Sequence, residues 1–134
     1  MKSEFAEETA PLRMIAGDTV TIKFVFYRDS NDPISLGSCK DIVWSLAPYG
    51  MNGPAIVVKK KSSIGGAGIS VPDTEGDEVD GEGLVNNVCY VTLYESDTKA
   101  LSGKYEYQMV LTDLKDQKFR KVRGTIIISR ANED

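Results

Sequence analysis

The amino-acid sequence predicts an all-β domain, an immunoglobulin-like antiparallel β-sandwich of seven to eight strands with one short helical turn. The first observation is a series of short segments in which apolar and polar residues alternate, with turn residues between them. The second is the stretch 95–111, where a helical turn leads directly into an alternating strand that contains Tyr105. In immunoglobulin-like sandwiches such a tyrosine marks the corner between strands E and F, and its hydroxyl bonds back to the corner backbone.

The corner itself is predicted from local signals. Ser96 or Asp97 is a suitable cap for a helical turn over residues 95–100, and Gly103 suits a left-handed residue at its end. The strand that follows alternates, with one face formed by Tyr105, Tyr107, Met109 and Leu111. The same signals occur at surface turns of other β-proteins, so a plain strand after a plain turn is the alternative interpretation.

The first half of the chain contains three further expected strands. Residues 12–15 suit a short edge strand, and residues 19–27 alternate most clearly, with Lys23 on the polar face, where it discourages edge pairing. The apolar face of this strand is Val20, Ile22, Phe24 and Phe26. Residues 41–47 follow, with Ile42, Trp44 and Leu46 pointing inward. Because a tryptophan on the third strand fills the middle of such sandwiches, we predict that Trp44 is buried beside Tyr105 or Met109.

Two charged segments lie in the middle of the chain. Residues 55–61 form a strand that ends in three consecutive lysines, which suits either an anion contact or, as we prefer, a solvated strand end. After a short strand at 69–71, residues 72–87 carry six acidic residues and no basic one. Clustered carboxylates on a glycine-containing loop suit Ca²⁺, but their spacing does not fit the EF-hand pattern, so we expect an acidic hairpin without a specific metal.

The last two expected strands are 84–94, with Cys89, Val91 and Leu93 inward, and 119–129, with Val122, Ile126 and Ile128 on one face. A hairpin loop at 113–117 precedes the final strand. Basic residues next to and within this strand form an expected basic flank, consisting of Lys118, Arg120, Lys121 and Arg123.

Composition excludes several functional classes. The 134 residues suit one domain, the formal net charge of −4 does not favour nucleic-acid binding, and no apolar stretch has the length of a membrane span. The chain has no histidine, which removes the commonest general base and every histidine-ligated zinc site. No other catalytic or cofactor-binding constellation is recognisable, so we expect neither an enzyme nor a cofactor. Cys39 and Cys89 are expected to be free, partly buried thiols.

The N-terminal residues 1–11 form an acidic arm without strand periodicity, and residues 12–134 form the sandwich domain. Acidic residues stand where a signal peptide would have its apolar core, so we expect synthesis in a cytoplasm. The arm lacks the pattern of a core strand, and we expect something outside this domain to hold it. Its candidate contact residues are Glu4, Phe5, Glu7 and Glu8.

Four runs of residues resemble a known family. They are GDTVTIKF from Gly17, SLGSCKDIVWSL from Ser35, LSGKYEYQMVLTD from Leu101 and VRGTIII from Val122. Together they look like the N-terminal domain of bacteriophage baseplate upper proteins and related immunoglobulin-like virion modules, over about residues 12–130. The resemblance implies a non-enzymatic virion protein, made in the host cytoplasm, in the tail, baseplate, neck or capsid surface. The 134 residues do not include the receptor-binding-protein adaptor region that the resemblance leads us to expect after this domain, and the acidic segment is larger than expected for the family.

The leading hypothesis is therefore a virion structural protein whose partners are other virion proteins and copies of itself, with no nucleic acid or membrane. The arm carboxylates would contact the basic flank of an adjacent copy. The alternative is a carbohydrate-binding β-sandwich module, for which Tyr49, Tyr90 and Tyr94 are the available aromatic residues. A small enzyme is the third and least supported hypothesis.

Overall fold

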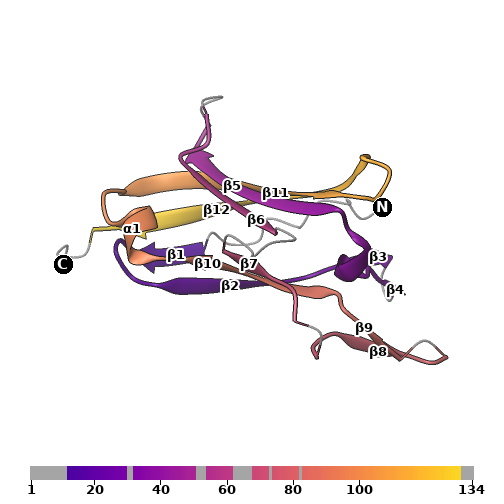
Figure 1. Cartoon of the computed structure of the whole chain (residues 1–134). Coiled ribbons are helices and arrows are strands. Elements are labelled where there is room, and N and C mark those ends of the chain that lie inside the picture. Colours follow the sequence, from indigo (N-terminus) through magenta and orange to yellow (C-terminus); the bar gives the residue numbers. More distant parts are fainter. Residues whose placement is uncertain are drawn as a thin grey trace.

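The protein is a β-sandwich, seen in a computed structural model that describes residues 12–29, 32–50, 54–61, 68–72, 74–81 and 83–130. Figure 1 shows the two main layers, a five-stranded sheet in the order β1-β12-β11-β5-β6 and a three-stranded sheet in the order β2-β10-β7. The strands of the larger sheet are β1 (Leu12–Ile15), β5 (Asp41–Pro48), β6 (Val57–Lys61), β11 (Gly103–Thr112) and β12 (Lys118–Ser129). Those of the smaller sheet are β2 (Val20–Val25), β7 (Ile69–Ser70) and β10 (Val88–Leu93).

The strand order confirms the predicted immunoglobulin-like sandwich. The series β12-β11-β5-β6 corresponds to strands G, F, C and C′, and β2-β10-β7 corresponds to B, E and D. The pairs within these two series are antiparallel, but β1 pairs with β12 in parallel, so the sandwich is not antiparallel throughout. The short elements are β3 (Tyr27–Asp29), β4 (Asp32–Pro33), η1 (Leu36–Ser38), β8 (Asp77–Val79), β9 (Gly83–Val85) and α1 (Glu95–Thr98).

Aromatic side chains from both sheets meet in the middle of the core. Trp44 on β5 is fully buried, as the sequence predicts, and its register partner on β11 is Met109. The indole stacks on the ring of Tyr107, with 5.9 Å between ring centroids. On the other side, Phe24 of β2 meets the Tyr107 ring edge to face at 5.8 Å. These three rings therefore connect the two sheets at the centre of the sandwich.

The Tyr107 ring lies over a glycine of the neighbouring strand. Gly124 on β12 is the register partner of Tyr107, and a Cβ at Gly124 would lie 2.3 Å from the phenol ring. Because the ring is also held by Trp44 and Phe24, it has little room to withdraw. Gly124 is thus required by a close approach, and its φ is not in the left-handed region.

The corner between β10 and β11 forms as predicted. The Tyr105 hydroxyl donates to the Ser102 carbonyl at 3.0 Å and accepts from the Ser102 N–H at 3.2 Å. The helical turn α1 begins at Glu95, as predicted, but ends at Thr98 and has Tyr94 as its N-cap. Neither Ser96 nor Asp97 caps it; instead the Asp97 carboxylate reaches back to accept from the Tyr94 N–H at 2.7 Å. This is the return contact of a capping box, which satisfies one of the free amides at a helix start.

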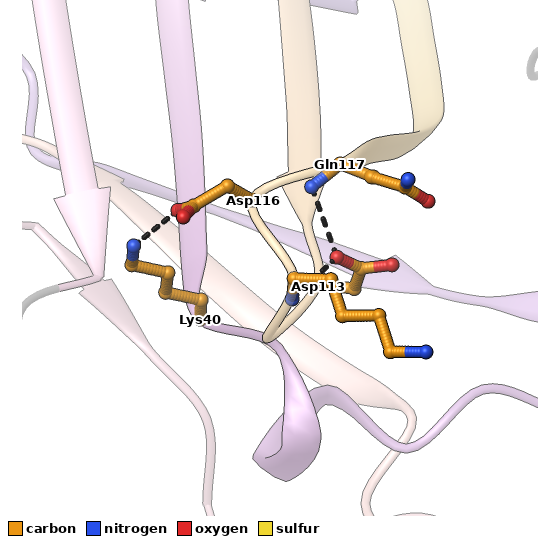
Figure 2. A network of polar contacts seen from close by, with 5 residues as sticks. Lys40, Asp113, Asp116 and Gln117 are labelled. Atoms are coloured by element: carbon orange, nitrogen blue, oxygen red, sulfur yellow. Dashed lines mark hydrogen bonds and ion pairs between the residues drawn. The ribbon is translucent and has the colours of Figure 1, made fainter.

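The hairpin between β11 and β12 is held by one carboxylate. Asp113 accepts hydrogen bonds from the N–H groups of Lys115 and Gln117 at 2.8 and 2.9 Å, as Figure 2 shows in part. Asp116 adopts a left-handed conformation with φ of 64°, which aspartate tolerates better than most residues. Its side chain pairs with Lys40, and both groups are largely exposed, so this ion pair adds little stability.

Two expected strands are interrupted. The strand predicted over 19–27 ends at Val25, because Phe26 leaves the ladder and donates its N–H to the Asn87 carbonyl at 2.9 Å. The strand predicted over 84–94 is divided into β9 and β10 at Asn86 and Asn87. Asn87 is fully buried, and its amide donates to the Phe26 carbonyl at 3.2 Å. A buried asparagine that bonds backbone groups replaces the ladder at this point.

Candidate assembly surface

The four basic residues predicted as a flank all lie on β12. Lys121 and Arg123 alternate with the buried Val122, so both lie on the outer face of the five-stranded sheet. Lys118 is exposed at the beginning of the strand, beside the hairpin turn. For Arg120 the structure describes the backbone, which pairs in register with Leu111. The structure therefore brings together Lys121 and Arg123 as one outward-facing pair.

The outer face of the five-stranded sheet joins these cations to aliphatic side chains. The strand registers place Val110 opposite Lys121, Val43 opposite Val110 and Lys60 opposite Val43. Val43, Val110 and Lys121 are half-buried, whereas Lys60 is exposed. The next row across the sheet is Val58, Ser45, Gln108 and Arg123. We call these two rows the outer sheet face; it has short aliphatic and polar residues in the middle, Lys60 and Val58 at the β6 end, and Lys121 and Arg123 at the β12 end.

The other predicted contact residues lie outside the described part of the chain. Glu4, Phe5, Glu7 and Glu8 belong to residues 1–11, which precede β1. The sequence alone did not indicate that Arg13 lies beside β12 or that Lys60 lies in the same row across the sheet as Lys121. Their placement depends on the parallel β1–β12 pairing and on the β5–β6 register, and no local pattern encodes either one.

The run of three lysines is not a solvated strand end, and the prediction is wrong for Lys59. Its side chain is buried, with 8% relative exposure, and its Nζ lies 2.6 Å from the Asp97 carboxylate. The ammonium also stands 5.0 Å from the centroid of the Tyr94 ring. Lys61 donates to the carbonyls of Leu36 and Cys39 at 3.3 and 3.4 Å. Of the three lysines, Lys60 is the one that faces solvent.

Carboxylates of the acidic segment fasten its hairpin to β3 and to β10 of the smaller sheet. The Tyr27 hydroxyl donates to Asp77 at 2.7 Å, and the Tyr90 hydroxyl donates to Glu75. Each hydrogen bond to a carboxylate raises the pKa of the tyrosine, since ionisation would remove the donated proton. Figure 1 shows the β8–β9 hairpin extending away from the body of the sandwich. Within the described residues, no three Cys, Asp or Glu side chains are grouped so as to hold a metal ion.

The three tyrosines considered for carbohydrate stacking already have partners. Tyr90 is bonded to Glu75, Lys59 stands beside the Tyr94 ring, and the Lys104 ammonium lies 4.0 Å from the centroid of the Tyr49 ring. Tyr49 and Tyr94 remain about half exposed, at 47% and 51%. Tyr49 directly follows β5 and Tyr94 directly follows β10, and these two strands belong to different sheets. The structure therefore does not place all three tyrosines on one strand or one sheet.

Both cysteines are free and buried, which agrees with the prediction. Burial raises the pKa of the Cys89 thiol to about 12, with a smaller contribution from nearby Cys39. Burial also raises the pKa of the Cys39 thiol, against the opposing effect of the Lys61 charge. A nucleophilic cysteine needs the opposite shift, because the thiolate is the reactive form. These two thiols therefore act as small apolar core residues.

A groove of about 300 Å³ runs between β1 and β2, where the edges of the two sheets meet. Its floor is apolar and includes Met14, Ile22 and Ile126. Arg13, Thr21 and Lys23 also line it, and these three side chains are exposed. The sequence identified Lys23 only as a charge that discourages edge pairing; its place beside β1 depends on the packing of the two sheets.

No protein-family model and no curated protein matches this chain. Within the described residues, no helix has the length and apolar character that a membrane crossing requires. The fold and the surfaces described above are therefore the observations from which a function is inferred.

Proposed function

We propose that the chain is a non-enzymatic structural module of a bacteriophage virion that acts through protein–protein contacts with other virion proteins and with copies of itself. The resemblance to baseplate upper proteins implies an immunoglobulin-like sandwich, and the chain has that fold. The runs that carry the resemblance fall mainly on β2, β5, β11 and β12, which are long strands of the two main sheets. A shared fold alone does not establish a shared function, so the surface must carry the rest of the argument.

The observation that carries the proposal is the composition of the outer sheet face. Val43 and Val110 lie side by side on a solvent-facing surface, between Lys60 and Lys121. A flat strip of aliphatic residues bordered by cations suits a protein partner whose surface is apolar at the centre and acidic at the rim. The cations would contribute mainly to orientation and to the choice of partner, since exposed ion pairs add little affinity.

The ionisable side chains that could suggest catalysis have structural roles in this fold. Lys59 pairs with Asp97 at the corner, and Asp77 and Glu75 fasten the acidic hairpin. The buried thiols have pKa values raised by burial. The three tyrosines that would support carbohydrate binding each have a polar or cationic partner, which gives that alternative less support than an assembly role.

The proposal is tested with phage particles purified by density-gradient centrifugation from a lysate of a phage that encodes this chain. We expect the chain to be present in the particles in a fixed ratio to the major tail proteins, and labelled antibodies to decorate one site. A variant with Lys121→Glu and Arg123→Glu should be lost from the particles, whereas Lys115→Glu at the hairpin tip should be retained. A chain that stays soluble while particles form without it would refute the proposal. So would a monomer that binds glycans on an array and is missing from the particles.

A further inference from the structure

The groove between β1 and β2 has the features of a site that accepts an added strand. β2 pairs with β10 on one side, and β1 pairs with β12 on one side; each is the edge strand of its sheet within the described residues. An edge strand presents a row of backbone N–H and C=O groups that can pair with another extended chain. The two edges face each other across an apolar floor formed by Met14, Ile22 and Ile126.

The rim of this groove is basic. Arg13 and Lys23 line it from opposite sides, and both side chains are exposed. The edge of β2 also alternates in the usual way, with Ile22 pointing toward the core and Thr21 and Lys23 pointing outward. An occupant that complements this site is an extended peptide with an apolar residue on one face and carboxylates on the other.

The chain itself contains such a segment. Residues 1–11 read MKSEFAEETAP, with three glutamates against one lysine and a single aromatic residue, Phe5. In an extended strand Phe5 and Glu7 point to one side, and Glu4 and Glu8 point to the other. Phe5 would then enter the apolar floor of the groove, while Glu4 and Glu8 would lie on the outer side with Lys23. Eleven extended residues reach roughly 35–40 Å, which is enough to leave one domain and enter another.

We propose that residues 1–11 of one copy occupy the β1–β2 groove of a second copy and extend its smaller sheet beside β2. The neighbouring copy is favoured over the same chain by the direction of β1. Leu12 to Met14 of the same chain already line the groove as part of β1. For the same chain to fill the groove, it would have to reverse its direction at Pro11, immediately before the strand begins.

This inference deepens the proposed function, because it names a second copy of the chain as one assembly partner. It also revises the site expected from the sequence: the arm carboxylates contact Arg13 and Lys23 at the groove, and the flank of Lys118, Arg120, Lys121 and Arg123 remains available to another partner. The reciprocal exchange of two arms would give a closed dimer, and one-way exchange would give a linear chain of copies.

The test uses two full-length variants that differ in the size of an affinity tag. One carries Glu4→Cys, on the outer side of the arm, and the other carries Thr21→Cys, an exposed groove residue that also points outward. Oxidation of a mixture of the two variants should give a mixed disulfide on a non-reducing gel, with a mass between those of the two homodimers. Because the two tags differ in size, a product of this mass contains one chain of each variant. The control replaces Thr21→Cys with Lys115→Cys, also exposed but at the hairpin tip, and should give no mixed product. The buried thiols Cys39 and Cys89 are common to all variants.

Substitutions without new cysteines complete the test. Phe5→Ala should weaken self-association measured by sedimentation roughly ten- to a hundredfold, from the loss of one buried aromatic side chain. Lys23→Glu should weaken it roughly two- to tenfold, and Lys115→Glu should leave it unchanged. Melting curves should be the same for all three, since none of these side chains belongs to the described core.

A disulfide in the double variant Glu4→Cys/Thr21→Cys that forms only inside one chain would overturn the proposal, as would the absence of any product. The outcome is independent of the proposed function. A chain present in particles without the mixed disulfide would refute the arm exchange alone, and a mixed disulfide in a chain missing from particles would refute the virion role alone.

Discussion

Replacing Trp44 tests the central packing of the sandwich. The indole is fully buried, it stacks on Tyr107, and its Nε1–H finds no hydrogen-bond acceptor among the described residues. Two substitutions separate the contribution of the buried aromatic ring from that of the unpaired Nε1–H donor. Trp44→Ala removes the apolar bulk together with the unpaired donor, whereas Trp44→Phe removes the donor and keeps most of the aromatic bulk.

The expected magnitudes differ between the two variants. Removing a buried tryptophan costs about 3–5 kcal/mol, because the transfer free energy is lost and a cavity remains. A buried donor without a partner costs about 1–3 kcal/mol, and phenylalanine removes this cost. Trp44→Phe also removes the apolar atoms of the five-membered indole ring. Their loss costs about 2 kcal/mol, from the usual transfer free energy of each buried CH₂ group. These two contributions to Trp44→Phe are opposite in sign, so we expect a change within about 1.5 kcal/mol of zero.

The measurement is chemical denaturation followed by far-ultraviolet circular dichroism, since both variants lose the only tryptophan. In the wild-type protein, native fluorescence should be blue-shifted, as expected for a buried indole. A loss below 1 kcal/mol for Trp44→Ala would refute the assignment of Trp44 to the core. A loss for Trp44→Phe as large as that for Trp44→Ala would show that the indole N–H contributes to stability and that the donor has a partner.

Four further predictions concern single side chains. Gly124→Ala should destabilise the domain by about 1–3 kcal/mol in a urea titration, because a Cβ would overlap the packed ring of Tyr107, and a neutral result would contradict this packing. Tyr105→Phe should cost about 0.5–1.5 kcal/mol in the same assay, for the lost corner hydrogen bond. Lys59→Met should cost about 1–3 kcal/mol, because it leaves the partly buried carboxylate of Asp97 without its cation. An unchanged urea midpoint would contradict the ion pair and support the original prediction that Lys59 is solvated. Cys89 should resist thiol reagents in the native state, and because its pKa is raised from 9.0 to about 12, its contribution to stability should be complete below pH 9 and decrease between those values.

The local elements of the fold could be predicted from the sequence because their signals are local. The alternation around Trp44 identified the inward face of β5, and the corner was identified by Tyr105 after a short helical turn. By contrast, the partners in long-range contacts could not be predicted from local sequence. The parallel pairing of β1, the burial of Lys59 and the break at Asn87 each depend on a residue far away in the chain. From the sequence alone a run of lysines is predicted to be solvated, because the sequence does not show which distant carboxylate one of them pairs with.

The same limit applies to the candidate surfaces. The sequence indicated a basic flank on the last strand, and Lys121 and Arg123 do share one face. It did not indicate that Arg13 and Lys23 border an apolar groove, because that arrangement requires the edges of two different sheets to meet. The charges were visible in the sequence, but the surface that they border is formed only by packing.

The central aromatic cluster explains how this sandwich connects its sheets without a disulfide. In antibody domains a bridge joins strands B and F, which correspond here to β2 and β11. In this chain Phe24 on β2 and Tyr107 on β11 make the contact between the sheets, and Trp44 packs against the same ring. A tyrosine is much larger than a half-cystine, and Gly124 on the adjacent strand provides the additional space. Because the connection is a packing contact, it forms equally well where thiols are kept reduced, so folding does not depend on an oxidising compartment.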